Sequence, residues 1–511
     1  MAIKKQIIIH PLFFAIFPVL FIFSHNRAEA LVIGQMAAPL AISIITALLL
    51  WAILGLVFRN WRKSALITSV SLLLFFSYGH FYSALTGVTF VGIKLWQHRY
   101  LLGGCGVLFL IIFIWAVKTR RKLDKLTLIL NAVSAVLVII SLINTVTYTV
   151  WRSSTRQRLQ AAGEGIIPLS ASGPGAYPDI YYIILDSYAN AHTLRDIYNF
   201  DNDDFIQFLE GKGFYVASLS CSNYGFSAPS LASSLNYEYL DYLRGADGNT
   251  VGSSVALFYL IENNKVIKFL KSRGYTIIHF DSGWGGTERN RHADIEIKCG
   301  YGNEFVMVLA QTTMLLPFKR PLNLIADDAR KRIIDTFARA ADISQEIPGP
   351  KFVFAHINCP HPPFIFGPEG EPLEMDMLSM TKWEKKKAYS DQVRFVNSKT
   401  EELVTTLLSD PEKLPVILIQ ADHGPISVRG FKNPSDRFLT ERMRILNAYF
   451  LPGAAGELLY PSISPVNTFR LIFNYYFDQD YPLLPDKSFY AGDTTSYDFY
   501  EVTDRVEFSG N

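Results

Sequence analysis

Charge is scarce in this chain, and it is unevenly spread. Charged residues make up 18% of the 511 positions and half of the residues are hydrophobic, whereas soluble domains usually have about 25% charged residues. Residues 1–150 hold 13 Lys and Arg but only two acids, Glu29 and Asp124; subtracted from totals of 48 and 46, this leaves 35 basic and 44 acidic residues in 151–511. These figures exclude a uniform soluble globule and a disordered chain. The basic residues lie between apolar runs, so nothing indicates a nucleic-acid-binding protein.

Cysteine is also scarce, with four in the whole chain. Cys105 lies in an apolar run, and no spacing among Cys221, Cys299 and Cys359 resembles a cysteine-based zinc site. In an oxidising compartment these three permit one disulfide and leave one thiol over, without indicating which two would pair. Internal repeats and low-complexity tracts are absent as well.

Five apolar runs dominate residues 1–150, each reaching or approaching the roughly 20 residues that a membrane-spanning helix needs. They contain no acidic residue, which argues against an ion or proton path. The sequence therefore predicts a five-helix transmembrane domain at 1–150, and it leaves open whether this domain does more than anchor the chain. The runs are Gln6–Ser24, Ala37–Phe58, Ser64–Leu85, Leu101–Val117 and Leu126–Val150.

The orientation follows from the connections between these runs. Basic residues precede the first run and are concentrated after the second and fourth, so the positive-inside rule places the N-terminus in the cytoplasm and everything beyond Trp151 outside. The first 30 residues also resemble a cleavable signal peptide, since they contain Lys4-Lys5, then an apolar stretch, then Ala28-Glu29-Ala30. The apolar stretch is longer than the roughly 7–15 residues of such peptides, which favours an uncleaved helix. We expect a multi-pass inner-membrane protein whose C-terminal domain is periplasmic or extracellular.

A linker rich in Ser, Gly, Ala, Pro and Arg is predicted at 151–177, followed by an exterior domain at 178–511. Short apolar runs alternate there with amphipathic stretches, which favours an α/β fold with a mostly parallel central sheet flanked by helices. The expected strands are Ile180–Leu185, Tyr275–Phe280, Lys351–Ile357, Pro415–Gln420 and Ile445–Leu451. The expected helices lie near Asp203–Gly211, Val255–Lys271, Leu324–Ala341, Lys385–Leu408 and Pro465–Phe477.

Acidic residues and histidines follow several of the predicted strands. Ligands of open α/β sheets bind beyond the carboxyl ends of the strands, and these ends carry Asp186, Asp281 and the pair Asp422-His423. Carboxylate oxygen and imidazole nitrogen together are a ligand set for zinc or manganese. We therefore predict that Asp186, Asp422 and His423 bind a divalent metal, whereas Asp281 is more simply explained as a helix N-cap.

Other residues near these strand ends are candidates for contact with a substrate. His361 lies in a proline-rich loop that fixes its backbone, and we expect it to take part in catalysis. His356, within a predicted strand, is equally well explained as a core histidine, and Trp284 as a core tryptophan. We nevertheless include His356, Trp284 and Asn223 as candidate substrate-binding residues.

A nucleophile is expected in the segment 221–236, where a polar turn enters a helix of small residues. The free backbone N–H groups at a helix start suit an anionic phosphate. Ser227 is best placed as both nucleophile and metal ligand, with Ser230 as the alternative. Several serines of this helix must be ordinary caps.

These motifs resemble the alkaline phosphatase and sulfatase superfamily. The strand ending in Asp186, the segment Ser227-Ala228-Pro229-Ser230 and Asp422-His423-Gly424 are similar to its first metal-ligand strand, its nucleophile motif and its late metal pair. With the membrane helices in front, the chain looks like membrane-anchored lipoteichoic acid synthases and phosphoethanolamine transferases. Sulfatases have Arg where this chain has Leu231, which argues against conversion of the nucleophile to formylglycine.

The resemblance implies a metal-dependent phosphotransferase or hydrolase. A phospho-head-group would pass from a membrane phospholipid to Ser227, with His361 protonating the leaving oxygen or helping to bind a second metal, and then to an envelope glycan or lipid. Two alternatives stay open: a membrane-tethered phosphodiesterase, phosphatase or sulfatase that uses water as acceptor, and a catalytically inactive domain that binds the envelope.

Overall fold

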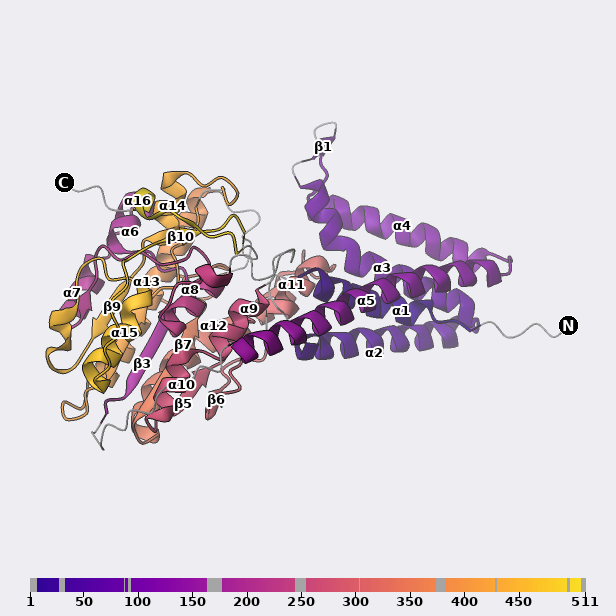
Figure 1. The fold of residues 1–511 in the computed structure, drawn as a ribbon. Coiled ribbons are helices and arrows are strands. Elements are labelled where there is room, and N and C mark those ends of the chain that lie inside the picture. The colour runs from indigo at the N-terminus through magenta and orange to yellow at the C-terminus, as the bar shows by residue number, and fades with distance from the viewer. Residues whose placement is uncertain are drawn as a thin grey trace. The chain divides into compact units, whose positions relative to one another are not determined.

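The chain forms two compact units in a computed structural model (Figure 1). The first unit comprises Met1–Arg27, Leu31–Ser154 and Gly302–Ile325, and the second comprises Ala28–Ala30, Thr155–Tyr301 and Ala326–Asn511. The structure describes residues 7–26, 33–86, 88–90, 93–162, 177–243, 254–302, 304–373, 382–427, 430–493 and 497–506.

Long apolar helices make up the first unit. Four of them are long and apolar enough to cross a membrane among the described residues: Gly34–Phe58, Trp61–Leu85, His98–Lys118 and Asp124–Gln157. They belong to α2 (Ile33–Phe58), α3 (Trp61–Leu85), α4 (His98–Lys118) and α5 (Asp124–Ala162), and a small hairpin of β1 (Thr89–Phe90) and β2 (Ile93–Lys94) precedes α4. The first predicted span is the shorter helix α1 (His10–His25, 16 residues), so four of the five predicted spans have the expected length.

The two most basic connections of the first unit lie at the same end of its helices. Arg62, at the start of α3, forms an ion pair with Asp124 at the start of α5, with 2.6 Å between the charged atoms. Lys63 donates hydrogen bonds to the carbonyl oxygens of Val117 and Thr119, at the end of α4, at 2.8 and 2.9 Å. This end therefore gathers the positive charge that the sequence analysis assigned to the cytoplasmic side.

A segment from the second half of the chain also belongs to the first unit. Residues Gly302–Ile325, within the predicted exterior range 178–511, contain α11 (Glu304–Thr312), which packs against α1, α2 and α3. Phe305 meets Phe23 edge to face, with ring centroids 6.2 Å apart. The division between the units is therefore not the single cut that the sequence indicated. The predicted linker at 151–177 is described in part: α5 continues to Ala162, and 163–176 lie outside the described residues.

A seven-stranded sheet forms the centre of the second unit, in the order β4-β9-β8-β3-β7-β5-β6. The pairings from β8 to β6 are parallel, whereas β9 is antiparallel to β8 and to β4. The sheet is thus mixed, with the predicted parallel arrangement in its middle. Its strands are β3 (Ile180–Leu185), β4 (Tyr215–Val216), β5 (Thr276–Phe280), β6 (Ile295–Ile297), β7 (Lys351–Ile357), β8 (Val416–Gln420) and β9 (Asn447–Phe450).

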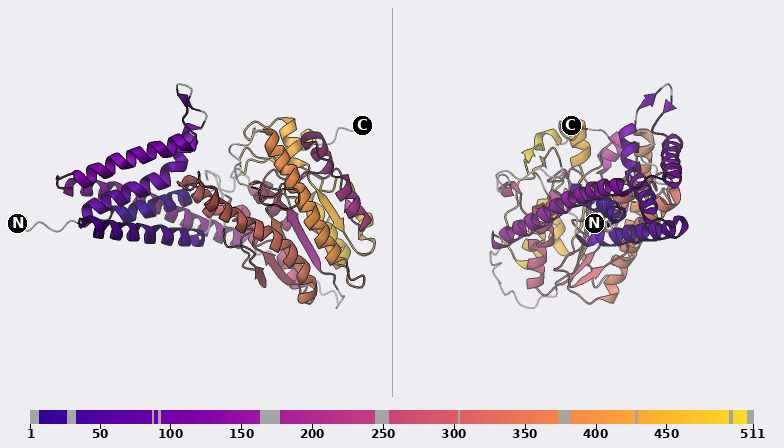
Figure 2. Two further views of the ribbon diagram at one scale, coloured as in Figure 1. Left: turned by 180° about the vertical axis from the view of Figure 1, so that it is seen from behind. Right: turned by 90° about the vertical axis from the view of Figure 1, so that its right-hand side faces the viewer.

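Helices cover both faces of this sheet, which explains why β3 is buried along its whole length. Tyr181 of β3 joins the core cluster that includes residues of α12 (Lys319–Glu346) and α13 (Lys382–Leu407). The left view of Figure 2 shows these two helices from behind. The next residue, Tyr182, points to the other face and meets Phe469 of α15 (Pro465–Phe477) at 5.2 Å between ring centroids. On that second face lie α8 (Ser227–Asn236), α10 (Lys265–Ser272) and α15.

The remaining elements are short. The single helix expected at Val255–Lys271 is split into α9 (Val255–Glu262) and α10, because the Asn264 side chain accepts a hydrogen bond from the Ile267 N–H at 2.8 Å and starts a new helix. All four cysteines are free thiols, so the disulfide that the sequence permits is not formed. The other elements are α6 (Ala191–Tyr198), α7 (Asp203–Gly211), α14 (Asp436–Met443), α16 (Thr503–Val506), β10 (Phe489–Tyr490) and β11 (Tyr500–Glu501).

Candidate active site

Strand register brings three of the predicted metal ligands together. Ile184 of β3 lies opposite Gln420 of β8 in a parallel pairing, so Asp186 and Asp422, each two residues further along, emerge side by side at the carboxyl edge of the sheet. Ligand atoms of Asp186, Asp422 and His423 all lie within 4.8 Å of one another, and all three residues are buried. The predicted convergence of residues from distant parts of the chain is thus present.

The carboxylate of Asp422 is satisfied on one oxygen only. Its Oδ1 accepts hydrogen bonds from the backbone N–H of Ser187 at 3.2 Å and of His423 at 2.9 Å. Its Oδ2 is buried, lies 3.4 Å from His423 Nε2 and has no hydrogen-bond partner among the described residues. A buried carboxylate oxygen without a partner is costly, and a divalent cation at this point would offset that cost. The donor set and the orphaned oxygen therefore fit a metal.

His423 links the carboxylates to the serine. Its Nε2 lies 3.0 Å from Ser227 Oγ and 3.7 Å from Asp186 Oδ1. Its Nδ1 lies 3.0 Å from the carbonyl oxygen of Gly424, which can only accept a hydrogen bond, so the proton of the neutral ring belongs on Nδ1 and the lone pair of Nε2 faces the cluster. Burial, assisted by the positive charge of Arg442, lowers the pKa of His423 to about 4. The imidazole is therefore neutral near pH 7, as a metal ligand must be.

Ser227 is the first residue of α8, and it is half-buried. The free N–H groups of that first turn give the hydroxyl an environment that favours a phosphate. Ser230, the alternative nucleophile, is buried and donates its hydroxyl hydrogen to the carbonyl oxygen of Asp422 at 2.6 Å. The two serines thus differ in position: Ser227 faces the ligand cluster, whereas Ser230 ties α8 to the loop that carries Asp422.

Histidines surround Asp186 and keep it ionised. Burial would raise the pKa of Asp186, but the electrostatic influence of His361, together with the nearby rings of His356 and His423, holds it well below its usual value. His361 lies in the predicted loop after β7, and its Nδ1 is 2.5 Å from the carbonyl oxygen of Pro362. A role of His361 in catalysis stays a prediction.

His356 and Trp284 form one packed group next to Asp186. His356 Nε2 lies 3.5 Å from Asp186 Oδ2, and its Nδ1 forms a hydrogen bond with Thr287 Oγ1 at 2.8 Å. Trp284 meets His356 edge to face at 5.5 Å and Phe258 at 5.0 Å. These contacts hold His356 beside Asp186, and a direct contact of His356 or Trp284 with a substrate stays a prediction.

Asn223 contributes to a different part of the structure. Its amide donates to Ser464 Oγ at 3.0 Å and to the carbonyl oxygen of Lys487 at 2.9 Å, and its Oδ1 accepts from the N–H of Val466 at 2.8 Å. These bonds fix the start of α15, and none of them reaches the ligand cluster. The geometry therefore gives no support to the predicted role of Asn223 in substrate binding.

Two residues of the site were missed in the sequence analysis. Ser187 follows Asp186 with a left-handed backbone (φ +65°), and its hydroxyl donates to Asp186 Oδ1 at 3.0 Å. The buried guanidinium of Arg442 donates from Nε to the carbonyl oxygen of Gly225 at 2.6 Å and from Nη1 to that of Gly424 at 2.8 Å. Arg442 thus clamps the loop before Ser227 to the loop after His423, and burial lowers its pKa to about 10.

The close contact between the loop after His423 and the backbone of α14 requires a glycine at position 424. A Cβ atom on Gly424 would lie 2.1 Å from the carbonyl oxygen of Glu441, so only glycine lets the two backbones approach this closely. The Gly424 N–H in turn donates to the carbonyl oxygen of Arg442 at 2.7 Å. The glycine was part of the sequence motif, whereas its partner lies on α14, a helix that the sequence analysis did not predict.

Comparison with known proteins gives matches in structure only. No family model and no curated protein matches the sequence. The zinc-bound C-terminal periplasmic domain of EcEptC from Escherichia coli is 12% identical, with a TM-score of 0.45 over 66% of this chain and 95% of that one. Integral membrane lipooligosaccharide phosphoethanolamine transferase A from Neisseria meningitidis is 11% identical, with a TM-score of 0.39 over 91% and 95%. A putative sulfatase from Bacteroides fragilis is 13% identical, with a TM-score of 0.36 over 61% and 76%. Phosphoethanolamine transferases and a putative sulfatase are thus among the solved structures that this chain resembles in fold.

Proposed function

We propose that this chain is a membrane-anchored phosphotransferase. It moves the phospho-head-group of a membrane phospholipid to an envelope glycan or lipid acceptor, through a covalent intermediate on Ser227. One observation carries the proposal: the hydroxyl of a helix-opening serine lies 3.0 Å from a histidine whose ring belongs to a buried group of three metal-type ligands. Burying these polar groups together costs free energy while Asp422 Oδ2 lacks a partner. The same set of groups suits metal-assisted displacement at phosphorus.

Asp186, Asp422, His423 and Ser227 would hold the metal. Two carboxylates and one imidazole suit zinc or manganese. When bound, a divalent cation supplies positive charge that lowers the pKa of the Ser227 hydroxyl, so that its alkoxide is available near neutral pH. Hydrogen bonds support these side chains. The Ser187 hydroxyl donates to Asp186, and both Arg442 Nη1 and the Nδ1–H of His423 donate to the carbonyl oxygen of Gly424.

The reaction takes two displacements. In the first, Ser227 Oγ forms a bond to phosphorus while the bond from phosphorus to the lipid alcohol breaks, and protonated His361 gives its proton to the departing oxygen. In the second, an acceptor hydroxyl passes its proton to His361 and attacks the same phosphorus, which releases Ser227 as an alkoxide. Ser227 and His361 thus end each cycle in the state in which they began it.

The proposed role of the membrane helices is to anchor the chain in the membrane that contains its donor. We propose that α1 is a fifth crossing, although its 16 residues span roughly 24 Å. With five crossings, the N-terminus and the basic end marked by the Arg62–Asp124 ion pair lie in the cytoplasm, and the second unit lies outside. Tethering then keeps the site at a high effective concentration of lipid.

The test uses the full chain in vesicles of phosphatidylethanolamine and phosphatidylglycerol, with zinc or manganese, followed by intact-mass analysis. The proposal predicts that the wild type gains the mass of a phospho-head-group on Ser227, that an added acceptor removes it, and that Ser227→Ala gains none. Head-group release without an acceptor would assign hydrolysis in place of transfer. A wild type that carries less than one equivalent of metal and acquires no adduct would support an inactive envelope-binding domain and contradict the proposal.

A further inference from the structure

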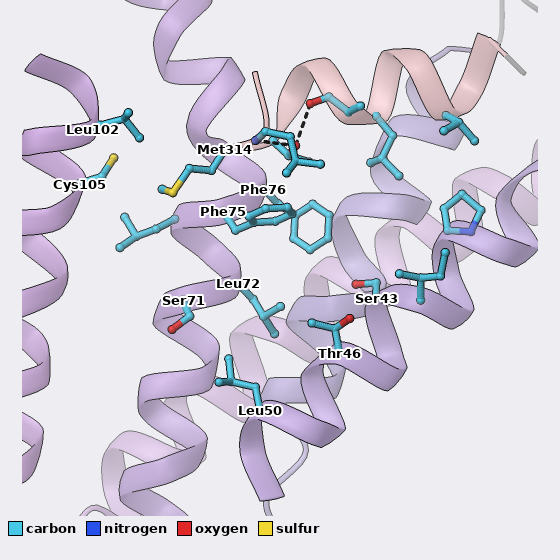
Figure 3. Close-up of a pocket in the computed structure, with 18 of the residues that line it drawn as sticks. Ser43, Thr46, Leu50, Ser71, Leu72, Phe75, Phe76, Leu102, Cys105 and Met314 are labelled. Carbon is cyan, nitrogen blue, oxygen red and sulfur yellow. Dashed lines mark hydrogen bonds between the residues drawn. The ribbon is translucent and has the colours of Figure 1, made fainter. Parts of the chain in front are cut away.

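A large cavity lies within the first unit, whereas the residues of the candidate active site belong to the second unit. Its volume is about 710 Å³, and it is bounded by α2, α3, α4 and the returning segment Gly302–Ile325. Figure 3 shows Leu102 and Cys105 on α4, with Phe75, Phe76 and Met314 among the other residues that line it. The volume falls within the range of roughly 300–1,000 Å³ that is typical of small-molecule sites.

The lining of this cavity offers almost nothing to a polar ligand. Among the described residues, no charged side chain lines it. Three of its hydroxyl groups donate to backbone carbonyl oxygens of the helices: Ser43 to Ala15 at 2.8 Å, Ser71 to Ile67 at 2.9 Å and Thr313 to Ala310 at 2.8 Å. A ligand that fits must therefore be apolar along the length that enters.

The cavity adjoins the apolar outer surface of the helices. Ile42 of α2 lines it and is 65% exposed. On α4 the lining residues Leu102, Cys105, Gly106 and Phe109 follow helical spacing and form one face. A Cβ atom on Gly106 would have no atom within 4 Å, so this glycine leaves open space at the cavity wall. In a bilayer, lipid acyl chains contact such an outer surface.

The wall contributed by the returning segment is firmly attached. The N–H of Met314 donates to the carbonyl oxygen of Phe75, within α3, at 2.7 Å. Gly79 allows this approach, because a Cβ atom there would lie 2.1 Å from the carbonyl oxygen of Gln311. Phe305 and Leu309 of α11 join the core cluster of α1, α2 and α3. The cavity is therefore a built feature of the first unit.

We propose that this cavity binds one acyl chain of a membrane phospholipid. A flexible alkyl chain matches a space between helices that has an apolar lining and adjoins the lipid-facing surface. A polar or charged molecule would lose its hydration without gaining partners. The inference rests on the membrane placement in the proposed function and is independent of the chemistry at Ser227.

The test uses the full chain in vesicles of phosphatidylethanolamine and phosphatidylglycerol that contain a trace of phosphatidylethanolamine with a diazirine near the end of one acyl chain. After illumination, mass spectrometry of peptides locates the adducts. In Gly106→Leu the new side chain occupies the cavity, whereas in Gly104→Leu it lies about 200° round the same helix. Gly104 also has no atom within 4 Å of its Cβ position, which makes the two variants a matched pair.

We expect wild-type adducts to be enriched on lining residues such as Phe75, Phe109 and Met314 relative to the outer face of α5. Gly106→Leu lowers that enrichment several-fold, and Gly104→Leu leaves it unchanged. Adducts spread evenly over the outer faces, or an enrichment equal in both variants, would overturn the inference. The Ser227→Ala variant retains the adducts, so loss of the proposed chemistry and loss of the acyl site are told apart.

Discussion

Ser227 Oγ lies 3.0 Å from His423 Nε2, although the two residues are 196 positions apart in the chain. Ser227 opens α8 on one face of the sheet, and His423 follows β8 at the carboxyl edge of the same sheet. The contact exists because the β3–β8 register brings Asp186 level with Asp422 and because Ser230 ties α8 to the carbonyl of Asp422. The hydroxyl of Ser227 therefore lies at the metal-type cluster, where its reactivity can be changed.

The first prediction separates the two serines. Ser227→Ala removes the hydroxyl at the cluster and is expected to lower turnover by roughly a thousandfold or more, since loss of a catalytic nucleophile costs at least that much. Ser230→Ala removes a hydrogen bond to a backbone carbonyl and is expected to cost about 1 kcal/mol of unfolding free energy with much of the turnover retained. Head-group transfer and thermal melting measure the two effects. Equal loss of turnover in both variants would contradict the assignment.

The second prediction concerns Arg442 as a positioning residue. Arg442→Lys keeps the charge but replaces a planar fork by one ammonium group, which cannot reach the carbonyls of Gly225 and Gly424 in the same geometry. We expect metal affinity or turnover to fall about 10–100-fold, the usual cost of losing an outer-shell partner. Metal titration and thermal melting of each variant separate the two explanations. If Arg442→Lys melts within a few degrees of the wild type, a change in metal affinity is not caused by general loss of structure. Unchanged metal affinity in that case would show that the clamp has no effect on the site.

Several features of the site could be predicted from the sequence. Asp186, Asp422 and His423 follow continuously apolar strands, and a parallel sheet places such strand ends at one edge. Ser227 opens a helix of small residues, which is a local pattern as well. The five predicted strands and most predicted helices are present for the same reason, because apolar periodicity reports burial directly.

The parts that were missed depend on contacts between distant segments. Arg442 lies on a short helix with a polar sequence, and its role comes from two backbone carbonyls that folding brings near it. The docking of α11 depends on the absent side chain of Gly79 and on a backbone hydrogen bond to Phe75. The amide of Asn223, in contrast, is used to start α15. No residue pattern along the chain reports such pairings.

The third prediction is a pH dependence of stability at Glu262. Its carboxylate is nearly buried and accepts hydrogen bonds from Arg156 Nη2 at 2.8 Å and Arg291 Nε at 2.6 Å. Burial would raise the pKa of Glu262, but the hydrogen bond and charge of Arg291, with the charge of Arg156, lower it below its usual value of 4.5. Folding therefore favours the ionised form of Glu262. Its contribution to the free energy of unfolding is fully present above pH 4.5 and is lost as the pH falls through the lower pKa of Glu262 in the folded chain.

Glu262→Gln is therefore expected to cost about 1.5–3 kcal/mol of unfolding free energy at pH 7. The difference from the wild type should shrink as the pH falls below 4.5, in thermal or chemical unfolding of the full chain. Glu402→Gln is the control, since Glu402 is exposed and pairs with Lys399 of its own helix at 2.8 Å; such a pair contributes about 0–1 kcal/mol. A Glu262→Gln difference that stays constant with pH would contradict the assignment.

The most direct test of the account is the metal content of the full chain after equilibration with zinc and removal of the excess, measured by elemental mass spectrometry. Asp281→Asn is the matched control, because Asp281 follows β5 at the same sheet edge, but its Oδ1 accepts from the Gly283 N–H at 2.7 Å. We predict one firmly bound equivalent in the wild type and in Asp281→Asn, and its loss in Asp422→Asn. Zinc retained in full by Asp422→Asn, or absent from the wild type, would contradict the proposed site.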